Sequence, residues 1–165
     1  MSDNMVRLLA LLESKERLME ELSCSLEEEQ SRIIDMNSVS MEESNRCKGE
    51  VTSRLARLTE ECHRLMESLG AERGIDKEIT LSLLIGSASD SEKERLVPLQ
   101  RRLLLLAGSL GRQQELNRRL LSRSLALIQR SLSLIGGLLG GGDVYGARGR
   151  LAAGSMGMSF LSREI

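Results

Sequence analysis

The sequence predicts an all-α protein: an elongated antiparallel helical hairpin or coiled coil, a third long helix and a flexible, glycine-rich C-terminal tail. Three observations lead to this fold class. Leucine supplies 32 of the 165 residues, whereas aromatic residues make up 1% and are only Tyr145 and Phe160. The chain has one proline and almost no run of β-branched residues, which argues against a sheet. A core of this composition has to be aliphatic, and long helices packed along leucine seams provide one.

The first helix is expected from about residue 3 to 35. Glu16 and Gln30 interrupt its apolar stripe, and Glu27, Glu28 and Glu29 are assigned to its solvated face. The segment 35–38 supplies turn and cap residues, and Ser40 with Glu43 has the spacing of a capping box for the next helix. The stripe itself recurs at spacings of mostly three and four residues: Met5, Leu9, Leu12, Met19, Leu22, Leu26 and Ile33.

The second helix, expected over residues 40–69, has the clearest period. Its apolar residues are spaced by four, three, four, three and four, which is a heptad seam that requires a partner helix. The short link to the first helix implies an antiparallel hairpin with arms of roughly 45 Å. Gly70 and Gly74 are expected to end the helix. The seam consists of Val51, Leu55, Leu58, Cys62, Leu65 and Leu69.

A less regular apolar patch over residues 79–85 follows, as a short helix or a hydrophobic loop that covers one end of the hairpin. Ser89 and Glu92 then form a second capping-box pattern that opens the third helix, expected over residues 90–139. Pro98 either kinks this helix or marks its first turn. The seam of the first half is Leu96, Leu99, Leu103, Leu106 and Leu110.

The second half of the third helix is apolar around much of its circumference. One seam contains Leu121, Leu125, Ile128, Leu132, Ile135 and Leu139, and a second row beside it contains Leu120, Leu127, Leu134 and Leu138. A two-helix hairpin can cover only one face of such a helix. The other face therefore needs a partner, a second copy or the chain's own tail. We divide the chain into a helical coiled-coil domain, residues 1–139, and a flexible tail, residues 140–165.

The net charge of −1 conceals a strong asymmetry along the chain. Residues 1–45 hold 4 basic and 11 acidic residues (−7), residues 46–100 hold 9 and 10 (−1), and residues 101–165 hold 10 and 3 (+7). This pattern predicts an acidic first helix beside a basic third helix; alternatively, the basic segment meets an acidic partner.

Several function classes are excluded or disfavoured. His63 is the only histidine, and Cys24, Cys47 and Cys62 show no CxxC spacing, so a metal site and a disulfide framework are not expected. No constellation satisfies the requirements of an active site, and we expect no enzyme activity and no cofactor. Nucleic-acid binding is disfavoured because no aromatic residue accompanies the arginines. No stretch suits a signal peptide or a stable membrane insertion, which indicates a soluble, cytoplasmic protein.

Two short stretches resemble a known family. Residues 114–121, QELNRRLL, are similar to an "N-x-x-N-x-x-L-L" stretch, with Gln114 at the position of the first asparagine. Residues 144–150, VYGARGR, resemble a "Y-G-x-x-G" tail motif. Together with the order of the helices, these stretches resemble the FlgN-type flagellar export chaperones (flagellar type III secretion chaperones for hook-associated proteins).

The resemblance implies a chaperone that binds the C-terminal helical segment of hook-associated (hook–filament junction) proteins. It would prevent premature assembly and deliver them to the flagellar type III export gate. Asn117 would bind this cargo or set register within the chain. Tyr145, with Gly146 and Gly149, would contact the cargo or the export machinery. The apolar cargo-binding residues would be Leu120, Leu121, Leu125, Ile128, Leu132 and Ile135.

The alternative from another class is a self-associating structural coiled-coil adaptor, which would bury the same apolar surplus between identical copies. A nucleic-acid binder is a more distant third. For the chaperone we expect a monomer or a weak homodimer.

Overall fold

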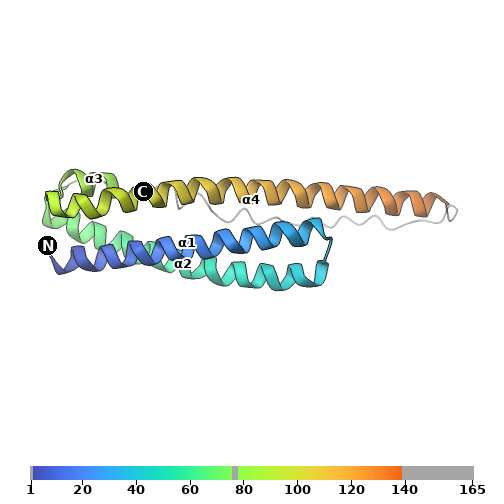
Figure 1. Cartoon of the computed structure of the whole chain (residues 1–165), viewed down its shortest axis with the longest axis horizontal. Helices are drawn as coiled ribbons and strands as arrows, with labels where there is room; N and C mark the ends of the chain where they lie inside the picture. The colour runs from blue at the N-terminus through green and yellow to red at the C-terminus, as the bar shows by residue number, and fades with distance from the viewer. Residues whose placement is uncertain (1, 76–77, 139–165) are drawn as a thin grey trace.

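The chain forms an elongated assembly of helices in the computed structural model, which describes residues 2–75 and 78–138 (Figure 1). The elements of this described part are α1 (Asp3–Ile34), α2 (Ser38–Glu72), the short α3 (Leu81–Gly86) and α4 (Asp90–Leu138), and it contains no strand. The all-α prediction is confirmed. The patch at residues 79–85 is a short helix rather than a loop, and Pro98 lies inside α4 rather than in its first turn.

α1 and α2 form the predicted antiparallel hairpin, and α4 runs alongside α1 in the same direction (Figure 1). α1 is the central helix because it packs against both α2 and α4. Glu21 of α1 is 3.5 Å from Arg54 of α2, and Glu16 and Glu13 of α1 pair with α4. The acidic first helix therefore lies beside the basic third helix, as the charge pattern predicts.

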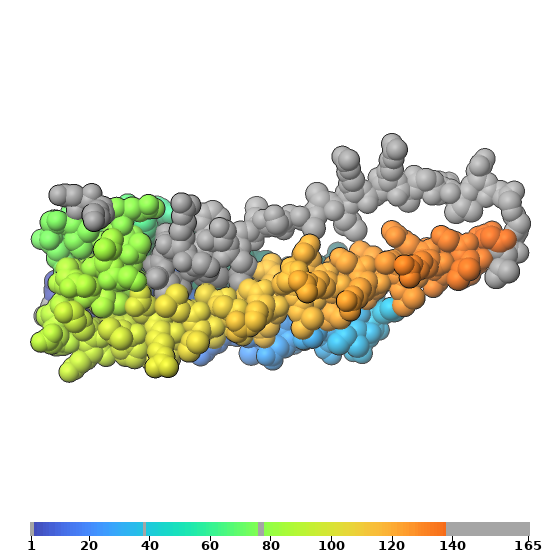
Figure 2. All heavy atoms as spheres, turned by 90° about the horizontal axis from the view of Figure 1, so that it is seen from above, coloured from blue at the N-terminus to red at the C-terminus, as the bar shows by residue number. Residues whose placement is uncertain are grey.

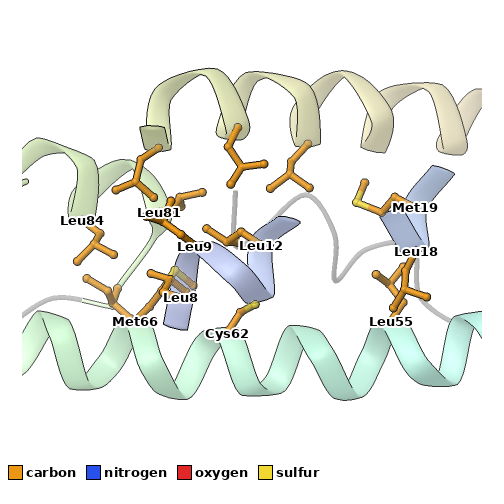
Figure 3. Packing of buried hydrophobic residues seen from close by; sticks show 14 of the residues in the cluster. Leu8, Leu9, Leu12, Leu18, Met19, Leu55, Cys62, Met66, Leu81 and Leu84 are labelled. Carbon is orange, nitrogen blue, oxygen red and sulfur yellow. The ribbon is translucent and has the colours of Figure 1, made fainter. Parts of the chain in front are cut away.

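The core is an aliphatic layer on both sides of α1. Figure 3 shows Leu8, Leu9 and Leu12 of α1 between α2 and the ribbons of α3 and α4. The whole predicted stripe of α1 is buried, from Met5 to Ile33. Each fully buried leucine or methionine contributes roughly 1.5–3 kcal/mol, so this layer supplies the main stabilising free energy. The buried residues outside the seam patterns include Leu8, Leu18, Met66, Leu84 and Lys15.

The hairpin turn differs in detail from the sequence prediction. α2 begins at Ser38, with Asn37 as its N-cap: the Asn37 side chain accepts a hydrogen bond of 3.2 Å from the Ser40 backbone N–H. Ser40 is therefore inside the helix, and the proposed Ser40–Glu43 capping box is wrong. Met36 takes a positive φ of 51° to reverse the chain. This compact turn allows α2 to start two residues earlier than expected.

α2 ends at Glu72 rather than at residue 69, because Gly70 continues the helix and Gly74 stops it. Gly74 has a φ of +69°, and the next backbone N–H, that of Ile75, donates to the Gly70 carbonyl at 2.9 Å. A left-handed residue after the last turn is the usual conformation in such a cap. Gly70 is close to Ile79, whose Cδ1 would lie 3.1 Å from a Cβ at this position.

The same chemical change at two glycines of α2 and its cap should have opposite effects. Gly74→Ala should lower the free energy of unfolding by about 1–2 kcal/mol, because an L side chain is strained at positive φ. Gly49→Ala should raise it by about 0.5–1 kcal/mol, since Gly49 is inside α2 with open space around it. Urea denaturation followed by circular dichroism measures both, and equal effects would contradict this account of the cap.

The predicted capping box at the start of α4 is confirmed in its main feature. The Ser89 backbone N–H donates to Glu92 Oε2 at 2.9 Å, and Arg73 donates to both carboxylate oxygens of Glu92 at 3.0 Å. Burial alone would raise the pKa of Glu92, but the hydrogen bonds from Ser89 and Arg73 outweigh it and leave the pKa below its ordinary value. Because Arg73 follows α2, this ion pair also fixes the start of α4 to the end of the hairpin.

Candidate functional site

The C-terminal part of α4 extends beyond the hairpin. Cross-helix contacts give its register: Gln113 bonds Ser23 and Glu27 of α1, and Asn117 bonds Glu29. With this offset the last residue of α1, Ile34, lies beside position 121 or so of α4. We call residues 121–138 the overhang. At 1.5 Å per residue it projects by about 27 Å, and Figure 2 shows this orange segment continuing past the blue end of the hairpin.

The overhang displays the same helix face that the bundle buries. Leu103, Leu110 and Asn117 face α1 and are buried. Continuing from Asn117 at spacings of four, four, three, four and three residues gives the overhang seam: Leu121, Leu125, Ile128, Leu132 and Ile135. Because the helix is continuous, this seam faces the space that a longer hairpin would have filled.

Each of the predicted apolar site residues is exposed or half-buried in the described structure. Leu121 and Leu125 are 37% and 39% exposed, and the exposed fraction rises to 62% at Leu132. Leu120 is half-buried where α4 leaves the bundle. The second row is also exposed at Leu127 and Leu134. An exposed apolar patch that is formed by several leucines of one helix is typical of a protein-binding face.

Asn117 differs from the other predicted site residues because it is inside the bundle. It is 4% exposed, and its amide nitrogen donates to the Leu26 carbonyl at 2.7 Å and to Glu29 Oε2 at 2.9 Å. These contacts favour the alternative in which Asn117 sets register within the chain. Lys48 of α2 bonds the other oxygen of Glu29, so one polar cluster joins α1, α2 and α4. The assignment of Glu29 to a solvated face is wrong, because Glu29 is 8% exposed.

The hairpin tip adds apolar groups that the sequence analysis did not assign to a site. Ile34, Met36 and Val39 are exposed, Val39 by 82%. They lie at the end of the hairpin from which the overhang departs (Figure 1). In the sequence, apolar residues in and next to a predicted tight turn are the signal that could have identified them. Exposed apolar side chains are therefore present both on the overhang and at the hairpin tip from which it departs.

The charges near the overhang are basic. Arg118 and Arg119 both bond Glu115, at 2.9 and 2.7 Å, and these hydrogen bonds lower the pKa of the Glu115 carboxyl to about 2. Arg123 and Arg130 are exposed, and within the described ranges 2–75 and 78–138 neither forms an ion pair. From Leu116 to Leu138 the sequence holds four arginines and no acidic residue.

Within the described part of the chain, the cysteines form no candidate site. Cys62 is buried in the α2 seam, as predicted, and Cys24 and Cys47 are exposed free thiols. Within residues 2–75 and 78–138, no group of histidine, cysteine and acidic side chains is placed to hold a metal ion. In the same part of the chain, no helix has the length and apolar character needed to cross a membrane. Tyr145, Gly146 and Gly149 lie outside the described residues.

Comparison with known proteins gives one family. The family model described as FlgN protein matches residues 1–153, which include all four helices. No curated protein and no solved structure matches the chain.

Proposed function

The chain belongs to the FlgN family of flagellar export chaperones, and from this premise we propose which cargo it takes and where. Its cargo is the C-terminal helical segment of hook-associated proteins, which binds the overhang seam in the cytoplasm. Binding prevents premature assembly, and the complex is delivered to the flagellar type III export gate. This role needs binding rather than catalysis, and the family is one of chaperones rather than enzymes.

The observation that carries the proposal is the continuity of the α4 seam across the end of the hairpin. Up to Asn117 this face packs on α1, whereas Leu125, Ile128 and Leu132 present the same face without a partner helix among the described residues. An amphipathic cargo helix would take the place of the missing hairpin turns and continue the bundle. This is the helix-in-groove mode of peptide recognition, in which anchors recur at helical spacing.

The partly exposed side chains of the overhang seam offer enough apolar area for a reversible complex. Complete burial of a leucine or isoleucine side chain contributes roughly 1.5–3 kcal/mol, so burying the exposed half of a seam residue contributes about 1 kcal/mol. The cargo side chains that pack against the seam contribute a similar amount. The cost of association and of ordering the cargo offsets much of this sum. We therefore expect a dissociation constant in the micromolar to nanomolar range, which suits a chaperone that must release its cargo.

Isothermal titration of the full-length chain tests the proposal. The titrants are the C-terminal helical segments of the hook-associated proteins, and the terminal helical segment of flagellin is the control. We expect one-to-one binding of at least one hook-associated segment, and weak or no binding of the flagellin segment. Absence of binding, with light scattering that reports a stable dimer, would instead establish the self-associating coiled-coil adaptor.

A further inference from the structure

Half of the arginines of α4 form no ion pair among residues 2–75 and 78–138. Residues 95–138 hold eight arginines, one glutamate and no lysine. Two of the arginines pair with acidic residues of α1, and Arg118 and Arg119 share Glu115. These four charges are therefore used within the chain. The four arginines without an ion pair in the described part of the chain are Arg101, Arg112, Arg123 and Arg130.

These four arginines form one row on the side of α4 that faces away from the hairpin. Arg101, Arg112 and Arg123 follow one another at eleven residues, and Arg130 comes seven residues later. At about 3.6 residues per turn, eleven residues are close to three turns and seven are close to two, so the side chains line up. Arg112 comes nine residues, or about two and a half turns, after the buried Leu103. The row is therefore opposite to the face that packs on α1.

A row of exposed leucines runs beside the arginine row. Each leucine comes four residues after one of the four arginines, so every arginine has a leucine on the next turn of the same face. The two rows together are the outer face of α4, which extends over roughly 50 Å at 1.5 Å per residue. Figure 2 shows α4 from the side away from α1, as the yellow and orange segment. The leucines are Leu105, Leu116, Leu127 and Leu134, and they are 66%, 46%, 55% and 69% exposed.

We propose that the outer face of α4 binds the surface of an anionic phospholipid membrane. The guanidinium groups pair with lipid phosphates, for which their planar arrangement of donors is suited. The leucine row enters the boundary between the headgroups and the acyl chains, and α4 lies in the plane of the interface. A helix face that combines arginine with exposed leucine is typical of binding to an anionic membrane surface.

The shape and composition of the outer face favour a lipid surface over other partners. A flat bilayer can contact both rows at once, because they lie on the outside of one continuous helix. A helical protein segment usually binds in a groove, whereas the outer face is convex and its eight residues are all exposed. A single-stranded nucleic acid would stack on aromatic side chains, and the sequence of α4 has none. The leucine row would gain no burial from a nucleic acid, but it does gain burial in a membrane interface.

Membrane binding and cargo binding use different sides of α4. Arg130 is two residues, or about 200° around the helix, from both Ile128 and Leu132 of the overhang seam. The overhang seam therefore stays accessible when the outer face lies on a membrane. This inference goes beyond the proposed function and does not depend on it.

Flotation of the full-length chain with lipid vesicles at low salt tests the proposal. We expect binding to vesicles of phosphatidylglycerol mixed with phosphatidylcholine, and no binding to vesicles of phosphatidylcholine alone. Arg112→Gln with Arg123→Gln should weaken binding to the anionic vesicles by about tenfold or more, because each arginine near an anionic surface contributes to the attraction. Arg17→Gln with Arg57→Gln is the control, since both arginines are exposed on the hairpin and the change in net charge is identical.

A leucine variant distinguishes a membrane from other polyanions. Leu105→Gln with Leu116→Gln keeps the net charge and should also weaken vesicle binding by about tenfold, because both side chains lose their contact with the apolar part of the interface. Val6→Gln with Val39→Gln, on α1 and α2, is the control for this change. Circular dichroism verifies that each variant is folded.

Three outcomes would overturn the proposal. The first is a wild-type chain that does not bind the anionic vesicles, and the second is an arginine variant that binds them as well as its control does. The third is a leucine variant with wild-type affinity, which would replace the lipid surface by a polyanion such as RNA. The titration with hook-associated segments decides the proposed function separately, because all of these variants keep the overhang seam.

Discussion

Replacing Leu125 and Ile128 with aspartate is expected to weaken binding of the hook-associated segment by more than about a hundredfold while the helical bundle stays folded. Both side chains are central in the overhang seam, and they are 39% and 43% exposed. Each aspartate removes an apolar anchor and places a carboxylate where the cargo helix would have to desolvate it. Truncation of central anchors usually dominates the loss of affinity at an interface.

The stability of the variant shows whether Leu125 and Ile128 contact the cargo or belong to the core of the chain itself. The overhang lies beyond the register of α1, so the double aspartate variant should keep its circular dichroism spectrum and most of its urea midpoint. The control is Leu104→Asp with Leu105→Asp, two leucines of α4 that are 47% and 66% exposed beside the bundle. The control should bind cargo normally. An unfolded Leu125/Ile128 variant would place these residues in the chain's own core instead.

The pattern of the sequence was sufficient for the helices and for the face that each one buries. The apolar stripe of α1 is buried throughout. Of the predicted α2 seam, Leu58 and Leu65 are half-buried and the other residues are buried. The pattern was insufficient for the exact helix ends, because several neighbouring residues can each act as the N-cap. Asn37 caps α2, although Ser40 and Glu43 have the spacing of a capping box. The two-residue difference in the start of α2 depends on the positive φ of Met36, which no periodicity encodes.

The sequence pattern also did not predict which polar residues are buried. Lys15 is 2% exposed and Glu29 is 8% exposed, although both lie in charged stretches of α1. The burial of Glu29 depends on a lysine of α2 and an amide of α4 that meet it from the two sides. Only the three-dimensional register brings positions 29, 48 and 117 together. The same register determines where the hairpin ends along α4, and hence how much of the predicted site is exposed.

Asn117 is the residue at which this register can be tested. Asn117→Ala is expected to lower the free energy of unfolding by about 2 kcal/mol, because it removes two buried hydrogen bonds and leaves part of Glu29 unsatisfied. For a chain of this size that corresponds to a fall in Tm of about 4–8 °C. Gln114→Ala is the control: Gln114 is exposed on the same helix, and its replacement should stay within about 0.5 kcal/mol.

A double-mutant cycle tests whether the loss of stability comes from the contact between Asn117 and Glu29. Asn117→Ala combined with Glu29→Ala should destabilise the chain by less than the sum of the single changes, with a coupling free energy of about 1 kcal/mol or more. Cargo affinity should fall little in Asn117→Ala below its melting temperature, because the overhang seam is intact. The opposite result, unchanged stability with a large loss of affinity, would make Asn117 a cargo contact. The polar cluster would then have no part in holding the overhang in position, and register would rest on the apolar seam and on the other polar contacts between α1 and α4, those of Gln113, Arg95 and Arg102.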